Sequence, residues 1–157
     1  MNKIPMTSSG YEKLQEELKK LINEDRPNII AAISEARSHG DLSENAEYQY
    51  AKEQQSLIEG KIKELESMSA LAEIIDVNQL SGKEIKFGAT VQIEDDESLN
   101  KSTYQIVGEY ESDIENKKLS INSPLARGLI GKTKGDIVEI NSPKGIKSYT
   151  ILSITYK

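Results

Sequence analysis

The stretch AKEQQSLIEGKIKELESM, residues 51 to 68, decides the fold of the first half of this chain. Its apolar residues recur at intervals of three and four, with lysine and glutamate between them. This spacing places the apolar side chains on one face of an α-helix, as in the heptads of coiled coils. The full pattern comprises Ala51, Gln54, Ile58, Ile62, Leu65, Met68, Ala72 and Ile75. We therefore expect a helix from Leu42 to about Asp76.

A second helical pattern precedes this one, from Thr7 to about Ser38. Its apolar positions are Tyr11, Leu14, Leu18, Leu21, Ile22, Ile29, Ile30, Ile33 and Ala36. The phase of the pattern slips by one residue near Leu21. Thr7 is expected to be the N-cap. Pro27 has no backbone N–H to donate, so it is expected to kink the helix without ending it.

The two patterns are separated only by the short break Gly40-Asp41-Leu42. Each is longer than about 30 residues, which corresponds to a helix on the order of 45 Å long. Two long helices joined by so short a connection are expected to form an antiparallel hairpin. The apolar faces would then meet in a coiled coil.

The second half of the chain has the alternating pattern of half-buried strands. Strands are expected at residues 89–94, 103–107, 118–121, 136–140 and 148–154, and a short helix at 123–130. The sequence therefore predicts an α+β fold: an antiparallel helical hairpin over residues 1–76, a linker over 77–83, and a strand-rich domain over 84–157.

The composition excludes several kinds of site. The chain has 157 residues, no cysteine and one histidine, His39. These counts exclude a disulfide framework, a thiol nucleophile and a cysteine-ligated zinc site. The sequence has no apolar run long enough to span a membrane and no signal-peptide pattern at its start. We expect a soluble cytoplasmic protein.

The charge is distributed unevenly along the chain. Residues 1–76 carry 9 basic and 15 acidic side chains, whereas residues 77–157 carry 11 of each, and the net charge is −6. A protein that grips nucleic acid by neutralising phosphates would need a basic surface. Contact with nucleic acid must therefore be local or depend on a partner.

Two explanations account for the acids Asp41 and Glu44 near the expected hairpin end. In the first, Gly40 ends one helix in a left-handed conformation, Asp41 caps the next, and Glu44 completes a capping box. In the second, the two carboxylates lie three residues apart on one helical turn and form half of a divalent cation site. Two carboxylates are too few to hold Mg²⁺ alone, so a partner would supply the other ligands.

Two basic residues, Arg37 and Lys52, flank the same end of the hairpin on opposite arms. They are either phosphate contacts or ordinary residues of a solvated helix face. Tyr48 and Tyr50 could stack on a base, but we favour a role in closing the hairpin end. His39 is expected to serve as a cap or as a partner of the helix dipole.

Several motifs together resemble bacterial transcript cleavage factors of the Gre family, nearest to its GreA branch. They are Ile4–Thr7, Arg26-Pro27, Ala36-Arg37, Gly40–Tyr48, Phe87–Val91 and Ser123–Lys132. The resemblance covers essentially the whole chain. It implies an N-terminal coiled coil followed by a C-terminal domain of the FKBP-like type without isomerase activity.

The resemblance also implies a function. The globular domain would dock on RNA polymerase and the coiled coil would enter its secondary channel. Asp41 and Glu44 would then stabilise a catalytic Mg²⁺ shared with the polymerase active site, so that the polymerase cleaves backtracked nascent RNA. Arg37 and Lys52 would bind RNA near its 3′ end, although Lys52 stands where relatives often have arginine.

Accordingly we expect an auxiliary factor that is no enzyme itself, has no cofactor of its own, acts as a monomer and has no membrane partner. Its partners would be RNA polymerase and the nascent RNA 3′ end. Two other classes of function remain open. One is a regulator that occupies the polymerase channel without cleavage, and the other is a coiled-coil adaptor or a peptidyl-prolyl isomerase. The low aromatic content, with one phenylalanine and no tryptophan, speaks against the isomerase.

Overall fold

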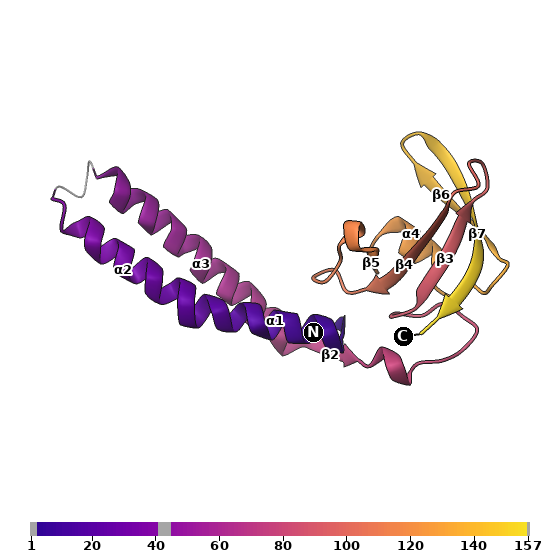
Figure 1. Ribbon diagram of the computed structural model, residues 1–157, viewed down its shortest axis with the longest axis horizontal. Coiled ribbons are helices and arrows are strands. Elements are labelled where there is room, and N and C mark those ends of the chain that lie inside the picture. The colour runs from indigo at the N-terminus through magenta and orange to yellow at the C-terminus, as the bar shows by residue number, and fades with distance from the viewer. Residues whose placement is uncertain (1–2, 41–44, 157) are drawn as a thin grey trace. The chain divides into compact units, whose positions relative to one another are not determined.

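The computed structural model describes residues 3–40 and 45–156 (Figure 1). The chain divides into two compact units. Tyr11–Ala72 belong to the first unit, and Lys3–Gly10 together with Glu73–Lys157 belong to the second. Within the described residues, no helix is both long enough and apolar enough to cross a membrane.

The first unit is the helical hairpin that the sequence predicts. Its first arm comprises α1 (Ser8–Lys20), a π-helical turn (Leu21–Asp25) and α2 (Arg26–Arg37), and its second arm is α3 (Ala46–Leu71). α2 and α3 lie side by side and run in opposite directions (Figure 1). Thr7 directly precedes α1, and its Oγ1 accepts a hydrogen bond of 3.0 Å from Gly10 N. The expected N-cap at Thr7 is thereby confirmed.

The seam between the arms is formed by the predicted apolar positions. The buried side chains of the hairpin are Leu14, Ile33, Ala36, Ala51, Ile62 and Leu65. Side-chain hydrogen bonds also join the two arms. Arg26 makes two hydrogen bonds of 2.9 Å to Glu59, which lower the pKa of Glu59 and raise the pKa of Arg26. Near the start of the first arm, Gln15 Nε2 donates to Ser69 Oγ at 2.6 Å.

The π-helical turn explains the phase slip in the sequence. Ile33 lies 19 positions after Leu14, whereas five whole turns of an α-helix take about 18 residues. Arg26 N–H donates to Leu21 O, a bond between residues five apart that takes up the extra residue. Leu14 and Ile33 can therefore both face α3. Pro27 is the second residue of α2, two positions after the end of the turn.

Removing the extra residue should leave the seam intact. We expect that deletion of the exposed Asn23, combined with Pro27→Ala, converts the π-helical turn into ordinary α-helix. The thermal unfolding midpoint, followed by the helical circular dichroism signal, should be no lower than that of Pro27→Ala alone.

The matched control is deletion of the exposed Ser56 in α3, where no π-helical turn can absorb the loss. That deletion rotates Ala51 away from Ile62 and should cost about 2–5 kcal/mol of unfolding free energy. Equal effects of the two deletions would contradict the assigned role of the turn.

The predicted limits of the second helix, Leu42 to about Asp76, are wrong at both ends. α3 begins at Ala46, because the side chain of Asn45 caps it by accepting a hydrogen bond from Tyr48 N. It ends at Leu71, because the next residues form strand β2 (Ala72–Ile75). β2 pairs with β1 (Ile4–Thr7) in a two-stranded sheet. Pairing with a distant strand thus outweighs the continuing heptad pattern.

The second unit contains a five-stranded sheet in the order β5-β4-β3-β7-β6. Its strands are β3 (Thr90–Asp95), β4 (Lys101–Val107), β5 (Lys118–Ser120), β6 (Ile137–Ser142) and β7 (Gly145–Thr155). Only the β4–β5 pair is parallel. Short helix α4 (Pro124–Leu129) lies between β5 and β6 in the sequence. The five predicted strands and the predicted short helix are confirmed.

The core of this unit lies between the sheet and α4. Alternate residues of the strands point toward it, and α4 adds two side chains. The buried members are Ile85, Ala89, Val91, Ile93, Ile106, Leu119, Ala126, Leu129, Val138 and Ile151. Two 3₁₀ turns, Val77–Gln79 and Ile114–Asn116, complete the described elements.

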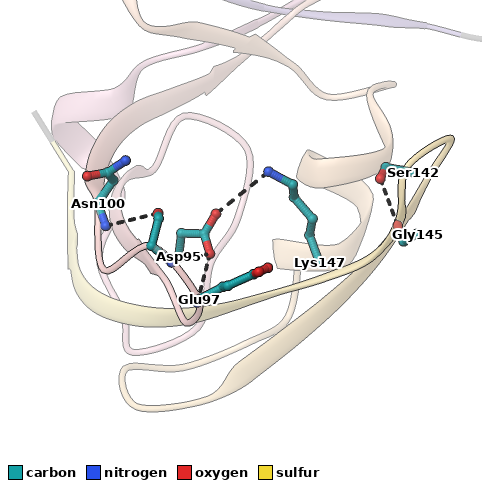
Figure 2. A network of polar contacts seen from close by, with 7 residues as sticks. Asp95, Glu97, Asn100, Ser142, Gly145 and Lys147 are labelled. Atoms are coloured by element: carbon teal, nitrogen blue, oxygen red, sulfur yellow. Dashed lines mark hydrogen bonds and ion pairs between the residues drawn. The ribbon is translucent and has the colours of Figure 1, made fainter.

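Asp95 organises the turn between β3 and β4 (Figure 2). Its carboxylate accepts a hydrogen bond of 2.9 Å from Glu97 N. Its backbone N–H donates to Asn100 O at 2.9 Å. Lys147 Nζ of the neighbouring strand β7 lies 3.8 Å from the Asp95 carboxylate. The backbone donors hold the pKa of Asp95 below its usual range. Asp95, one of the acids of this turn, therefore has a structural role, because its carboxylate binds the backbone of the turn.

Residues 3–10 are part of the second unit, a connection that the periodicity of the sequence does not indicate. Thr7 N and Gly108 N donate to the buried carboxylate of Glu111, at 2.8 and 3.2 Å, and Thr7 Oγ1 also bonds to it. A β-carbon at Gly10 would overlap this carboxylate. Glu111 thereby ties β1 and the first residues of α1 to the end of β4.

Candidate functional site at the closed end of the hairpin

The closed end of the hairpin comprises the last turn of α2, the residues up to Gly40, and the start of α3. α2 ends at Arg37, and Ser38 is its C-cap. Gly40 has a φ of +112°, the left-handed backbone that the sequence predicts for it. Ser38 N and His39 N donate to the carbonyls of Glu35 and Ala36, which completes the end of the helix.

Asn45 joins the two arms at this end. Its Oδ1 accepts a hydrogen bond of 3.1 Å from Tyr48 N, which caps the start of α3. Its Nδ2 donates a hydrogen bond of 2.7 Å to the carbonyl of Ala36 in the last turn of α2. The last carbonyls of an α-helix have no partner within the helix. Ala36 O also accepts from His39 N, so Asn45 adds a second bond there, and one side chain links a helix start to a helix end.

Two further contacts cross between the arms. The guanidinium of Arg37 lies 5.9 Å from the centre of the Tyr48 ring, within the range of a cation–π interaction. His39 Nε2 lies 3.7 Å from a carboxylate oxygen of Glu47, an ion pair when the imidazole is protonated. These contacts support the role in closing the hairpin that the sequence suggests for Tyr48, whereas Tyr50 is 64% exposed.

Arg37 and Lys52, the two predicted nucleic-acid contacts, are brought to the same end. Lys52 lies four residues after Tyr48 in α3, so the two share a helix face. Arg37 stands over Tyr48 from the other arm. Both cations are exposed, and the bond of Lys52 Nζ to Gln55 Oε1 is long, at 3.3 Å. The arrangement leaves two positive groups available to an anionic ligand.

Asp41 and Glu44, the predicted magnesium ligands, lie outside the described residues. The first explanation offered for them, that Asp41 caps the second helix, is wrong, because the N-cap of α3 is Asn45. In the part of the chain that the structure describes, no three histidine or acidic side chains gather as a metal site would require.

Asn45 is the main residue of this end that sequence reasoning missed. Asparagine is among the best N-cap residues, and this signal could have marked the helix start at Ala46. The heptad pattern drew the predicted start toward Leu42 instead. The bond from Asn45 to Ala36 joins residues nine apart across a reversal of the chain, which no local pattern reveals.

Models of one protein family match both halves of the chain. The model of the N-terminal region of transcription elongation factors matches residues 4–74, and the model of the GreA/GreB C-terminal region matches residues 80–156. A solved structure of GreA factor homolog 1 from Thermus thermophilus is 26% identical, with a TM-score of 0.46, covering 98% of this chain and 99% of that chain.

Individual relatives match over nearly the whole length. Transcription elongation factor GreA of Rickettsia conorii is 58% identical over 155 residues, covering 99% of this chain and 96% of that protein. Transcription elongation factor GreA of Chelativorans sp. is 56% identical over 156 residues, covering 99% of each. The chain therefore belongs to the GreA/GreB family of transcription elongation factors.

Proposed function

We propose that this GreA-type elongation factor binds RNA polymerase and stimulates Mg²⁺-dependent endonucleolytic cleavage of backtracked nascent RNA. The closed end of its hairpin enters the secondary channel, and the globular domain docks at the channel rim. The bond is broken in the active site of the polymerase, so the chain is an auxiliary factor with no cofactor of its own. It acts as a cytoplasmic monomer, with domains at residues 1–76 and 84–157 joined by the linker 77–83.

The hairpin supports insertion into a narrow channel. α3 has 26 residues, which corresponds to about 39 Å of continuous helix. The buried seam and the Arg26–Glu59 bonds join its two arms. A structure of this kind can carry a few side chains to a centre that a globular domain could not enter.

Asp41 and Glu44 supply the chemistry in this proposal. Mg²⁺ takes six oxygen ligands and usually keeps several waters, so two carboxylates cannot hold it tightly alone. They can complete a site to which the polymerase contributes the remaining ligands. In two-metal phosphodiester cleavage, one ion activates water and the other stabilises the leaving oxygen. The observation that carries this proposal is the match to the GreA/GreB family over both halves of the chain, at residues 4–74 and 80–156.

Arg37 and Lys52 hold the RNA in this proposal. Arginine binds phosphate through a planar fork, whereas lysine acts as a single point charge. Arg37 is held by the Tyr48 ring and would contact the phosphates near the RNA 3′ end. Lys52 would add electrostatic attraction with less geometric precision.

The proposal is tested with purified, backtracked elongation complexes. Addition of this protein should shorten the radiolabelled RNA from its 3′ end in the presence of Mg²⁺, and removal of Mg²⁺ should stop the shortening. If the protein binds the polymerase but the RNA keeps its length, the chain is a channel-occupying regulator and the cleavage function is wrong.

A further inference from the structure

We propose that a groove on one face of the hairpin takes a lysine or arginine side chain of RNA polymerase. The groove lies between α2 and α3, and its volume is about 210 Å³. The inference rests on the proposed function and names a contact by which the channel wall would hold the hairpin.

The floor of the groove is apolar and is formed mostly by small residues. Ala36 and Ala51, which are 3% and 5% exposed, line it from opposite arms. Ile29 and Ala32 complete it from α2. Since alanine has no side-chain atom beyond its β-carbon, the arms leave a hollow here. Its volume is below the range of about 300–1,000 Å³ that is typical of pockets for drug-sized ligands. A single long side chain is therefore a better match than a whole small molecule.

Two carboxylates stand at the rim of the groove, Glu35 from α2 and Glu47 from α3, and both residues are exposed. Glu47 lies 3.7 Å from His39. Within the described residues, the side chain of Glu35 makes no hydrogen bond or ion pair. Lysine and arginine bury an aliphatic stem on apolar surface and keep the charged end near water. An apolar floor below two negative charges matches this kind of side chain.

A tyrosine adds to the same preference. Tyr50 also lines the groove and is 64% exposed. Its ring has no printed burial against the opposite arm to explain its place, and the negative face of an aromatic ring attracts cations. The groove thus offers a basic side chain two carboxylates, an aromatic ring and an apolar floor.

The groove and the basic residues of the closed end lie on different faces of the hairpin. Each residue of an α-helix is turned by about 100° from the one before it. Arg37 directly follows Ala36 of the floor, and Tyr48, which contacts Arg37, directly follows Glu47 of the rim. One face therefore presents cations and the other presents carboxylates. Because like charges repel, the groove disfavours RNA phosphates, and a basic side chain of the protein wall is its complementary occupant.

The first test changes the charge of the rim and measures affinity for RNA polymerase by competition with labelled unchanged protein. Glu35→Gln should weaken binding by about tenfold, the effect of losing a bond to a charged group. Glu35→Lys should weaken it by about 100-fold or more, because it opposes one cation with another. The matched controls are Glu53→Gln and Glu53→Lys, which make the same charge changes at an exposed residue of α3 outside the groove. They should bind within about twofold of the unchanged protein.

The second test changes the shape of the groove without changing its charge. Ala32→Leu fills the hollow and should weaken binding by about tenfold, because the added atoms occupy the place of the incoming side chain. Ala31→Leu adds the same atoms at the neighbouring exposed residue, which does not line the groove, and should bind normally. Both alanines are exposed, so the thermal unfolding midpoints of the two variants should equal that of the unchanged protein.

Several results would overturn the inference. Normal binding by Glu35→Lys and Ala32→Leu would show that no side chain enters the groove, and equal losses in the Glu53 controls would show an effect of net charge alone. Tighter binding by Glu35→Lys would assign the groove to RNA. Self-association of the unchanged protein in sedimentation velocity, abolished by Glu35→Lys, would assign it to a second copy of the chain.

Failure of the proposed function gives a different result. If the unchanged protein binds polymerase and stimulates cleavage while the groove variants bind normally, only the inference is wrong. If the unchanged protein does not bind polymerase, the proposed function is wrong and the inference falls with it.

Discussion

Replacing either Asp41 or Glu44 with alanine is expected to reduce stimulated RNA cleavage by at least about 100-fold, the effect of removing a group that stabilises charge in a transition state. Each substitution removes one carboxylate from a pair that is already too small to hold Mg²⁺ alone. The measurement is the single-turnover rate of RNA shortening in purified backtracked complexes, with factor at saturating concentration.

A loss of cleavage is informative only if the Asp41 and Glu44 variants still bind RNA polymerase. The carboxylates act at the closed end of the hairpin, so the affinity for polymerase in a competition assay should stay within about threefold of the unchanged protein. Glu53→Ala, which removes an exposed acid from α3, is the matched control and should cleave normally. Near-normal cleavage by both Asp41→Ala and Glu44→Ala would refute the assigned chemistry.

The second large effect is expected at Glu111, where substitution should destabilise the second unit. Glu111→Ala leaves the donors Thr7 N and Gly108 N without an acceptor in a buried place, and unsatisfied buried groups cost about 1–3 kcal/mol each. We expect a loss of about 2–4 kcal/mol in the free energy of unfolding. Urea unfolding followed by tyrosine fluorescence measures it.

A surface acid from the same region provides the comparison. Glu115 is exposed in the 3₁₀ turn four residues further along, and Glu115→Ala should change stability by less than about 0.5 kcal/mol. Glu111→Gln keeps one acceptor and should lie between the two. If Glu111→Ala is as stable as Glu115→Ala, this carboxylate does not tie the N-terminal strand to the second unit.

Local patterns predicted most of the fold because most of its elements are defined by local chemistry. The three-and-four spacing of residues 51–68 and the alternation of the later strands follow directly from which face of each element is buried. β1 and β2 escaped notice because four-residue strands carry too little alternation and are defined by their pairing with each other. The phase slip near Leu21 was visible, but only the structure identifies it as a π-helical turn.

The site was predictable in residue type and less so in geometry. Arg37 and Lys52 both lie at the closed end of the hairpin. Their positions follow from the sequence, because a short break between two antiparallel helices brings the end of the first helix close to the start of the second. The sequence also suggested Asp41 as a cap of the second helix, but the N-cap of α3 is Asn45. A capping box and a metal-binding pair can both consist of two acids three residues apart, so residue type and spacing did not distinguish them. The cross-links through Asn45 and Tyr48 depend on the packing distance between the arms, which the sequence pattern does not fix.

The central claim is that this hairpin completes a magnesium site in another protein. The most direct measurement is the rate of RNA cleavage in backtracked complexes as a function of Mg²⁺ concentration, with the unchanged protein, with Asp41→Asn and with no factor. We expect the unchanged protein to lower the Mg²⁺ concentration for half-maximal cleavage, and Asp41→Asn to return it to the value without factor. An identical Mg²⁺ dependence in all three reactions would contradict the claim.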